Sequence, residues 1–172
     1  WNNGVFVGSI MGSETTAAAT GAVGVVRRDP MAMLPFCGYN MGDYWKHWIE
    51  IGKTLDPDKA PKIFNVNWFR KDDEGNFLWP GFGDNMRVLD WIIDRCEGKV
   101  DAQETAIGYL PYADDINLEG LDMTKEDLEK ILDVDKAAWE EEFKGVDELY
   151  AKFGDTLPEE LKAELNNVKE AL

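Results

Sequence analysis

The chain has 172 residues, of which 44% are hydrophobic and 30% are charged, and its net charge at pH 7 is −16. This length suffices for one domain with a hydrophobic core, and the composition is that of an ordinary globular protein. The charge is uneven, at −2 over residues 1–100 and −14 over residues 101–172, so neither part has the excess of basic residues that nucleic-acid binding requires. No apolar run reaches the length of a membrane span, and we therefore expect neither a nucleic-acid nor a membrane partner.

Cysteine and histidine are scarce in this chain. Two cysteines, Cys37 and Cys96, and a single histidine, His47, are too few for a disulfide framework or a zinc site. We interpret both cysteines as small buried hydrophobic residues and expect a reducing, cytoplasmic compartment. The first residue is Trp1 rather than Met, which suggests a piece of a longer protein.

The N-terminal part predicts a strand, a loop and a helix. The apolar run Val5–Ile10 predicts a buried strand, and the small-residue segment that follows, to Val25, is broken by threonine and glycine and favours a loop. Asn40 is expected to cap a helix that runs to about Gly52. One apolar stripe of that helix would comprise Met41, Tyr44, Trp45, Trp48 and Ile49.

The middle of the chain predicts a hairpin followed by a helix. Side chains alternate over Lys62–Phe69, which is typical of a strand, and a charged turn containing Gly75 would return the chain at Phe77–Trp79. A tight loop at residues 80–83 then precedes a helix that Asn85 caps and Gly98 ends.

The remaining sequence is mostly helical. Thr105–Leu110 predicts one further strand, and Thr124 opens a short helix with Asp127 in the capping-box position. A longer helix is expected from Asp135 to Gly154, with Glu140, Glu141 and Glu142 on a solvated face, and Pro158 starts the last helix. The predicted fold class is α+β with mixed α/β content, in which strands and a β-hairpin are followed by a helical C-terminal tail.

Residues 64–85 form the strongest candidate for a binding site. Six large aromatic side chains occur within residues 64–82, next to amide and carboxylate groups. Such rings can stack on the faces of a flat ligand like a nucleobase while polar groups contact its edge. Phe69 and Phe82 would sandwich one base, with Phe77 against its edge. Hydrogen bonds that select the base would come from Gly83, Asp84 and Asn85.

A second interpretation of the same rings is that they form the core of a small β-layer. We assign Trp79 and Phe64 to this core, whereas Trp68 lies between the two interpretations. Arg70 and Lys71 could contact a phosphate or a ribose, but exposed hairpin charges describe them better.

Three further arginines lie near these segments. Arg27 and Arg28 could latch the preceding loop, and we interpret them as solvated surface residues instead. Arg87 is expected to pair with Asp84 or Asp90.

The aromatic segment also carries a family resemblance. NWFRKDDEGNFLWPGFGDN, at residues 67–85, resembles the base-binding segment of the GTP-dependent phosphoenolpyruvate carboxykinases, and residues 4–19, 29–40 and 87–91 agree with that family in register. The resemblance covers the whole chain. It implies the C-terminal portion of a lyase of gluconeogenesis that binds GTP and a metal ion and converts oxaloacetate and GTP to phosphoenolpyruvate, GDP and CO₂.

The resemblance also implies a role for each segment. Residues 1–118 would be part of the nucleotide-binding domain, and residues 119–172 an acidic helical segment of the same domain. The guanine of GTP or GDP would lie at about residues 64–85, where the matching positions are Trp68, Phe69, Phe77, Phe82, Gly83, Asp84 and Asn85. A mobile active-site lid would span about residues 13–25 and include Ser13, Glu14, Thr16, Ala17 and Ala18.

The resemblance places the remaining machinery upstream of this chain. The sequence has no G-x-x-x-x-G-K-[ST] phosphate loop. We expect that loop, the catalytic groups and the ligands of Mn²⁺ or Mg²⁺ in the upstream portion of the same enzyme, a monomer when complete. The chain alone should be inactive. The alternative function is a non-catalytic module that stacks exposed aromatic rings on a sugar or a peptide, in which Trp79 would dominate binding.

Overall fold

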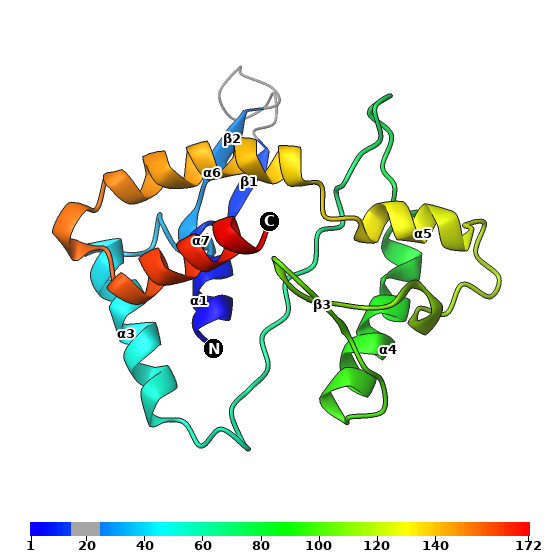
Figure 1. Ribbon diagram of the computed structural model, residues 1–172, viewed down its shortest axis with the longest axis horizontal. Coiled ribbons are helices and arrows are strands. Elements are labelled where there is room, and N and C mark those ends of the chain that lie inside the picture. The colour runs from blue at the N-terminus through cyan, green and yellow to red at the C-terminus, as the bar shows by residue number, and fades with distance from the viewer. Residues whose placement is uncertain (15–24) are drawn as a thin grey trace. The chain divides into compact units, whose positions relative to one another are not determined.

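The chain forms two compact units (Figure 1). The computed structural model describes residues 1–14 and 25–172. Unit 1 comprises residues 1–63 and 136–172, and unit 2 comprises residues 64–135. Helices and two small antiparallel sheets make up the described structure, which confirms the predicted α+β class. The proposed division at residues 118 and 119 stays a prediction.

Within its described residues, unit 1 contains four α-helices that share one core. They are α1 (Asn2–Ser9), α3 (Met41–Thr54), α6 (Lys136–Ala151) and α7 (Glu159–Ala171). Helix α1 packs against α3 and α7, and α7 runs beside α6 (Figure 1). The most deeply buried hydrophobic side chains of this core are Val5, Phe6, Trp45, Ile49, Val146 and Leu161. The C-terminal helices thus complete the core that the N-terminal residues begin.

The strand predicted at Val5–Ile10 is wrong, because these residues lie in α1 and its C-cap. The helix begins with a bond from Val5 N to Trp1 O of 2.9 Å. Gly4 and Gly8 let neighbouring side chains approach closely: a Cβ on Gly4 would lie 2.5 Å from Ile63 Cδ1, and one on Gly8 would overlap Met31 Sδ. A short apolar run is equally compatible with a buried helix, and tertiary packing decides between the two.

Helix α3 confirms its predicted start and apolar stripe. The Asn40 side chain accepts a hydrogen bond from Gly42 N at 2.7 Å, and the helix ends at Thr54. Met41, Trp45 and Ile49 are buried. Trp45 packs against Phe153, with ring centroids 4.6 Å apart.

A two-stranded antiparallel sheet projects from unit 1. Strand β1 (Gly12–Glu14) pairs with β2 (Val26–Arg28), with Gly12 opposite Arg28 and Glu14 opposite Val26. The segment predicted as a loop therefore begins as a strand. Residues 15–24 lie outside the described residues. A short 3-10 turn, η1 (Pro30–Ala32), follows β2.

Unit 2 contains helices α4 (Asn85–Cys96) and α5 (Lys125–Leu132) and a hairpin of β3 (Gln103–Thr105) and β4 (Gly108–Leu110). The single strand predicted at Thr105–Leu110 is therefore two strands. The core of the unit is formed by Trp79, Trp91, Ile116 and Leu128, against which Phe64 and Trp68 pack. The capping box of Thr124 and Asp127 is confirmed at the start of α5.

The first half of the predicted hairpin in unit 2 does not form a strand. Residues 62–69 are irregular, and an isolated antiparallel bridge joins Lys71 to Phe77. The turn is confirmed: Asp72 N donates to Asn76 O at 2.9 Å, and Gly75 has a φ of 86°. We call residues 69–78 the aromatic hairpin. Phe64 and Trp68 contribute to the core by packing rather than through a strand ladder.

Several local predictions are confirmed or corrected by the helix ends. Asn85 does not cap α4, since the N-cap is Asp84, whose side chain makes no capping hydrogen bond. Helix α6 ends at Ala151, a 3-10 turn η4 follows at Gly154–Thr156, and Pro158 is the N-cap of α7.

Cys37 is partly exposed and Cys96 exposed, so their predicted burial is wrong. Among the described residues, no helix is both long and apolar enough to cross a membrane.

Candidate functional site

The aromatic hairpin presents two neighbouring rings to solvent. Phe69 and Phe77 lie on its two arms, with ring centroids 6.1 Å apart and planes at 63°. These two residues are 71% and 58% exposed. The Lys71 ammonium lies 5.3 Å from the centroid of the Phe77 ring, a cation–π contact. Core packing therefore does not account for these two rings.

The loop before α4 presents a third ring. Phe82 begins a 3-10 turn, η2 (Phe82–Asp84), and is 90% exposed. It follows Gly81, whose φ of 132° is a conformation that favours glycine. At Gly83, no atom outside its two chain neighbours lies within 4 Å of the position a Cβ would take, so a ligand can approach the backbone there.

The other three aromatic side chains of residues 64–82 belong to the core. Trp79 is 7% exposed, and Phe64 and Trp68 pack against its cluster. The Trp79 indole Nε1 donates to Asn85 Oδ1 at 2.9 Å. This places Trp79 and Phe64 in the predicted core and adds Trp68 to it. Asn85 is the polar link between the core and the loop.

The polar residues of the loop are held by a network at the start of α4. Asp84 Oδ1 accepts from Arg87 Nε at 3.0 Å, which confirms one of the two predicted partners of Arg87. Arg87 Nη1 also donates to Asn117 O at 2.6 Å. Asp84 is therefore fixed as an acceptor for Arg87, and its backbone N–H donates to Gly81 O at 3.1 Å.

The predicted sandwich of one base between Phe69 and Phe82 stays a prediction. Within the described residues, ring contacts join Phe69 to Phe77, and none involves Phe82. All three rings lie in unit 2 and are exposed, as a stacking site requires.

The predicted lid lies only partly within the described structure. Ser13 and Glu14 lie in β1, whereas Thr16, Ala17 and Ala18 are not among the described residues. The role of this segment as a lid therefore stays a prediction.

Arg28, directly beyond the predicted lid, is not a solvated surface residue. Its Nη1 donates to Ile10 O at 3.0 Å and to Glu142 Oε1 at 2.6 Å. A Cβ on Gly145 would lie 2.6 Å from Arg28 Nη2, so the glycine makes room for the guanidinium. Arg27, by contrast, is largely exposed and pairs with Asp29 at 3.2 Å. The contact of Arg28 leaves no local signal in the sequence, because 114 residues separate it from Glu142.

Arg70 is likewise not a free hairpin charge. Its Nη1 donates to Ile131 O at 2.9 Å and to Asp133 O at 2.7 Å, at the end of α5. No local pattern indicates this contact, since its partners are backbone carbonyls 61 and 63 residues away.

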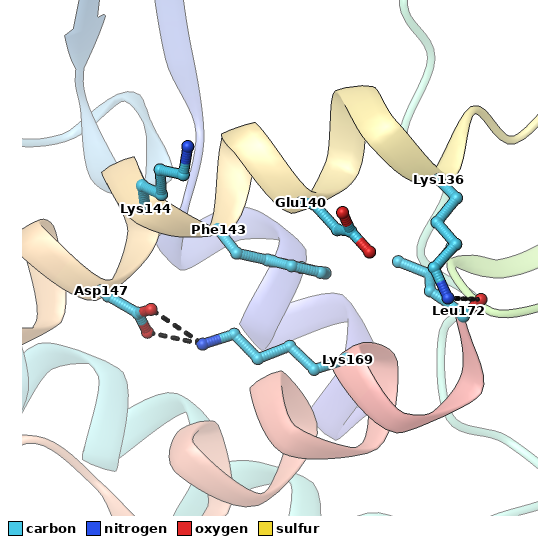
Figure 2. A pocket seen from close by; sticks show the side chains of 7 residues that line it. All are labelled: Lys136, Glu140, Phe143, Lys144, Asp147, Lys169 and Leu172. Carbon is cyan, nitrogen blue, oxygen red and sulfur yellow. Dashed lines mark hydrogen bonds and ion pairs between the residues drawn. The ribbon is translucent and has the colours of Figure 1, made fainter.

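A pocket of about 310 Å³ lies between α6 and α7 in unit 1 (Figure 2). Lys169 crosses it and donates to both oxygens of Asp147, at 2.8 and 2.9 Å, and its ammonium lies 5.5 Å from the Phe143 ring centroid. Lys136 Nζ donates to Leu172 O at 2.8 Å. These cations already have partners, so we interpret the pocket as a helix–helix contact. None of the residues predicted to bind a ligand lines it; its lining is Lys136, Glu140, Phe143, Lys144, Asp147, Lys169 and Leu172.

Metal ligation has no candidate within residues 1–14 and 25–172. No group of three or more His, Cys, Asp or Glu residues there could hold an ion.

In the aromatic hairpin, hydrogen bonds from the backbone and side chain of Asn76 lower the pKa of Asp72, because they favour the ionised carboxylate.

The fold and site define a class: a mixed α+β protein whose smaller unit exposes phenylalanines beside a glycine-containing polar loop. A family model described as the phosphoenolpyruvate carboxykinase C-terminal P-loop domain matches residues 1–171. The chain belongs to this family.

Curated relatives agree with this assignment. Proteins named phosphoenolpyruvate carboxykinase (GTP) from Renibacterium salmoninarum and Paenarthrobacter aurescens are 58% and 56% identical over 172 residues. The protein of that name from Treponema pallidum is 56% identical over 164 residues, or 94% of the chain. The chain spans 28% of the length of the first two relatives and 26% of the third.

Proposed function

We propose that this chain is the C-terminal part of a GTP-dependent phosphoenolpyruvate carboxykinase. Such an enzyme converts oxaloacetate and GTP to phosphoenolpyruvate, GDP and CO₂. The proposal draws on the family of the chain and on the names of relatives of which it spans 28%. The complete enzyme would be a cytoplasmic monomer that acts in gluconeogenesis.

In this proposal, unit 2 supplies the guanine pocket. The pocket comprises Trp68, Phe69, Phe77, Phe82, Gly83, Asp84 and Asn85. The observation that carries the proposal is the sorting of the rings: Phe69, Phe77 and Phe82 are exposed, although aromatic side chains of this size favour burial. Trp68 would support the pocket from its core side, since it packs against the core cluster.

Base selection would come from the polar groups around α4. Guanine presents a carbonyl acceptor and N–H donors along one edge. The Asn85 amide uses its oxygen for Trp79 and keeps two N–H donors on Nδ2, which suit the guanine carbonyl. Backbone carbonyl groups at Gly83 and Asp84 would accept from the guanine N–H groups.

The lid and the metal belong to the complete enzyme in this proposal. Residues at about 13–25, including Ser13, Glu14, Thr16, Ala17 and Ala18, would form the active-site lid. The phosphate loop and the ligands of Mn²⁺ or Mg²⁺ would lie in the upstream portion. When bound, the metal would neutralise phosphate charge during phosphoryl transfer.

Burial of Trp79 disfavours the alternative, a module that stacks aromatic rings on a sugar or a peptide. That function would use Trp79 as its main contact, but the residue is only 7% exposed. Its indole N–H is also taken by Asn85. Within residues 64–82, the exposed rings are all phenylalanines, which lack the polar handle of tryptophan and tyrosine.

The test is a comparison of GTP and ATP binding by titration calorimetry with Mn²⁺, on this chain joined to the upstream portion of the enzyme. We expect tighter binding of GTP, and a loss of affinity for Phe82→Ala. Equal affinity for both nucleotides, or no binding by a folded protein, would overturn the proposed function.

A further inference from the structure

Arg70 lies at the base of the aromatic hairpin and contacts a second element of unit 2. We propose that Arg70 is a positioning residue: by bonding the last carbonyls of α5, it holds the Phe69–Phe77 pair in place for a flat ligand. The ligand in this inference rests on the proposed function, whereas the mechanical role of Arg70 does not.

The end of α5 offers the acceptors for this contact. The last four carbonyls of a helix have no partner within the helix and carry its negative partial charge. Arg70 Nη1 donates to two carbonyls there, Ile131 O at 2.9 Å and Asp133 O at 2.7 Å. Asp133 has an extended backbone, with φ −65° and ψ 137°, so the chain leaves the helix without folding back over these carbonyls. The guanidinium takes the place of a backbone cap.

Helix α5 is a firm support for the hairpin. Its first turn is closed by the capping box of Thr124 and Asp127. Leu128 is buried in the core of unit 2, and Ile131 and Leu132 pack against that core. The Arg70 side chain, by bonding the end of α5, is therefore held to an element that is packed into the core.

The backbone of Arg70 joins the two arms of the hairpin. Arg70 O accepts from Leu78 N at 2.9 Å, and Lys71 and Phe77 form the adjacent bridge. Phe69 precedes Arg70 and Phe77 precedes Leu78. Each exposed ring is therefore next in sequence to one residue of the hydrogen-bonded pair Arg70 and Leu78, which the Arg70 side chain fixes to α5. Because the rings are exposed, their own burial cannot hold the hairpin against the rest of unit 2.

A fixed pair of rings binds more tightly than a moving pair. Ordering flexible side chains or loops on binding costs free energy, and a pre-ordered site avoids that cost. The contact between Arg70 and α5 thus contributes to affinity although Arg70 need not touch the ligand.

The decisive variant is Arg70→Gln, made in this chain joined to its upstream portion. We expect its affinity for GDP to fall about tenfold and amide exchange at Leu78 and Asp72 to accelerate about tenfold. The KM for GTP should rise more than kcat falls, because the residue positions rings rather than reacting groups. Arg70→Lys keeps a charged donor and should retain part of both properties.

Two variants act as matched controls on the same helix. Thr124→Ala removes the capping box at the opposite end of α5, so it lowers stability without removing the Arg70 contact. Asp133→Asn removes a carboxylate but keeps the carbonyl that Arg70 bonds. Both should keep the wild-type affinity for GDP and the wild-type exchange at Leu78.

The outcomes separate the two proposals. Wild-type exchange and affinity in Arg70→Gln, or equal effects of Thr124→Ala and Arg70→Gln, would overturn the positioning role. If the wild-type protein shows no preference for guanosine nucleotides, the proposed function fails. The exchange rates at Leu78 and Asp72 then decide the role of Arg70 by themselves.

Discussion

The indole N–H of Trp79 donates to the side-chain oxygen of Asn85 over 2.9 Å, and this bond joins the core of unit 2 to its exposed loop. Trp79 is buried, whereas the loop that ends at Asn85 exposes Phe82 almost completely. Asn85 therefore has two tasks: its oxygen satisfies a buried donor, and its nitrogen has the role proposed for base recognition.

Two substitutions at Asn85 separate these tasks. Asn85→Asp keeps an oxygen acceptor for Trp79 and loses both N–H donors, so we expect near-normal stability and weaker guanosine nucleotide binding. Asn85→Ala also leaves the Trp79 N–H without a partner, which should cost about 1–3 kcal/mol of unfolding free energy. Denaturant unfolding and GDP titration of both variants provide the measurement. Equal stability losses would show that the bond to Trp79 contributes little.

Phe82→Ala tests the exposed ring. Since Phe82 is 90% exposed, we expect the unfolding free energy to change by less than about 0.5 kcal/mol. Affinity for GDP should fall by about 1–3 kcal/mol, the usual contribution of one stacked ring. Trp79→Ala is the contrasting variant, with an expected stability loss of about 3–5 kcal/mol from the buried cavity. Unfolding curves and calorimetry would contradict this assignment if Phe82→Ala unfolded the protein.

Arg28 and Glu142 should contribute to stability as a pair. Their 2.6 Å bond joins β2 to α6, and Arg28 also bonds Ile10 O. We expect Arg28→Gln to cost about 1–2 kcal/mol of unfolding free energy. Arg27→Gln and Glu141→Gln are matched controls, because Arg27 and Glu141 are mostly exposed and should change stability by less than about 0.5 kcal/mol. Comparable losses for Arg27→Gln and Arg28→Gln in thermal unfolding would refute this expectation.

A substitution at Gly145 in α6 tests how closely the Arg28 guanidinium packs against that helix. Gly145→Ala improves helix propensity by about 1 kcal/mol, yet its Cβ would displace the Arg28 guanidinium. We expect the substitution to destabilise the wild-type protein and to stabilise an Arg28→Ala variant. A double-mutant cycle by denaturant unfolding measures this change of sign. Stabilisation in both backgrounds would mean that the Arg28 guanidinium moves aside without any cost in unfolding free energy.

The turn of the aromatic hairpin should open at low pH. Hydrogen bonds from Asn76 hold the folded pKa of Asp72 below its ordinary value of 3.8. A depressed carboxyl pKa contributes stability above the unfolded pKa, and that stability is lost as the pH falls through the folded pKa. We therefore expect the Asn76 amide resonance in NMR spectra to shift below pH 3.8 toward that of an open turn. In Asp72→Asn, which keeps a side-chain acceptor without a titrating group, this pH step should vanish.

The sequence predicted well the features that depend on neighbouring residues. Asn40 and the pair Thr124 and Asp127 stand where helices begin, because their side chains cap backbone groups two or three residues away. Pro158 also stands at a helix start, because its fixed φ suits that position. Gly75 marked the hairpin turn because glycine readily adopts the positive φ, here 86°, that the turn requires. The long motif at residues 67–85 indicated the family, which the comparisons then established.

Contacts between distant residues decided what the sequence left open. Val5–Ile10 formed a helix because α3 and α7 enclose it, although its side chains suit a strand equally well. The six rings of residues 64–82 were divided into core and surface by packing against Trp91, Ile116 and Leu128, which lie outside that segment. Arg28 bonds Glu142, which is 114 residues away, and Arg70 bonds Ile131 O, which is 61 residues away. Burial and ion pairing are properties of the assembled chain, so local pattern determined the turns and helix starts, and only the tertiary structure determined which rings and arginines are available to a ligand.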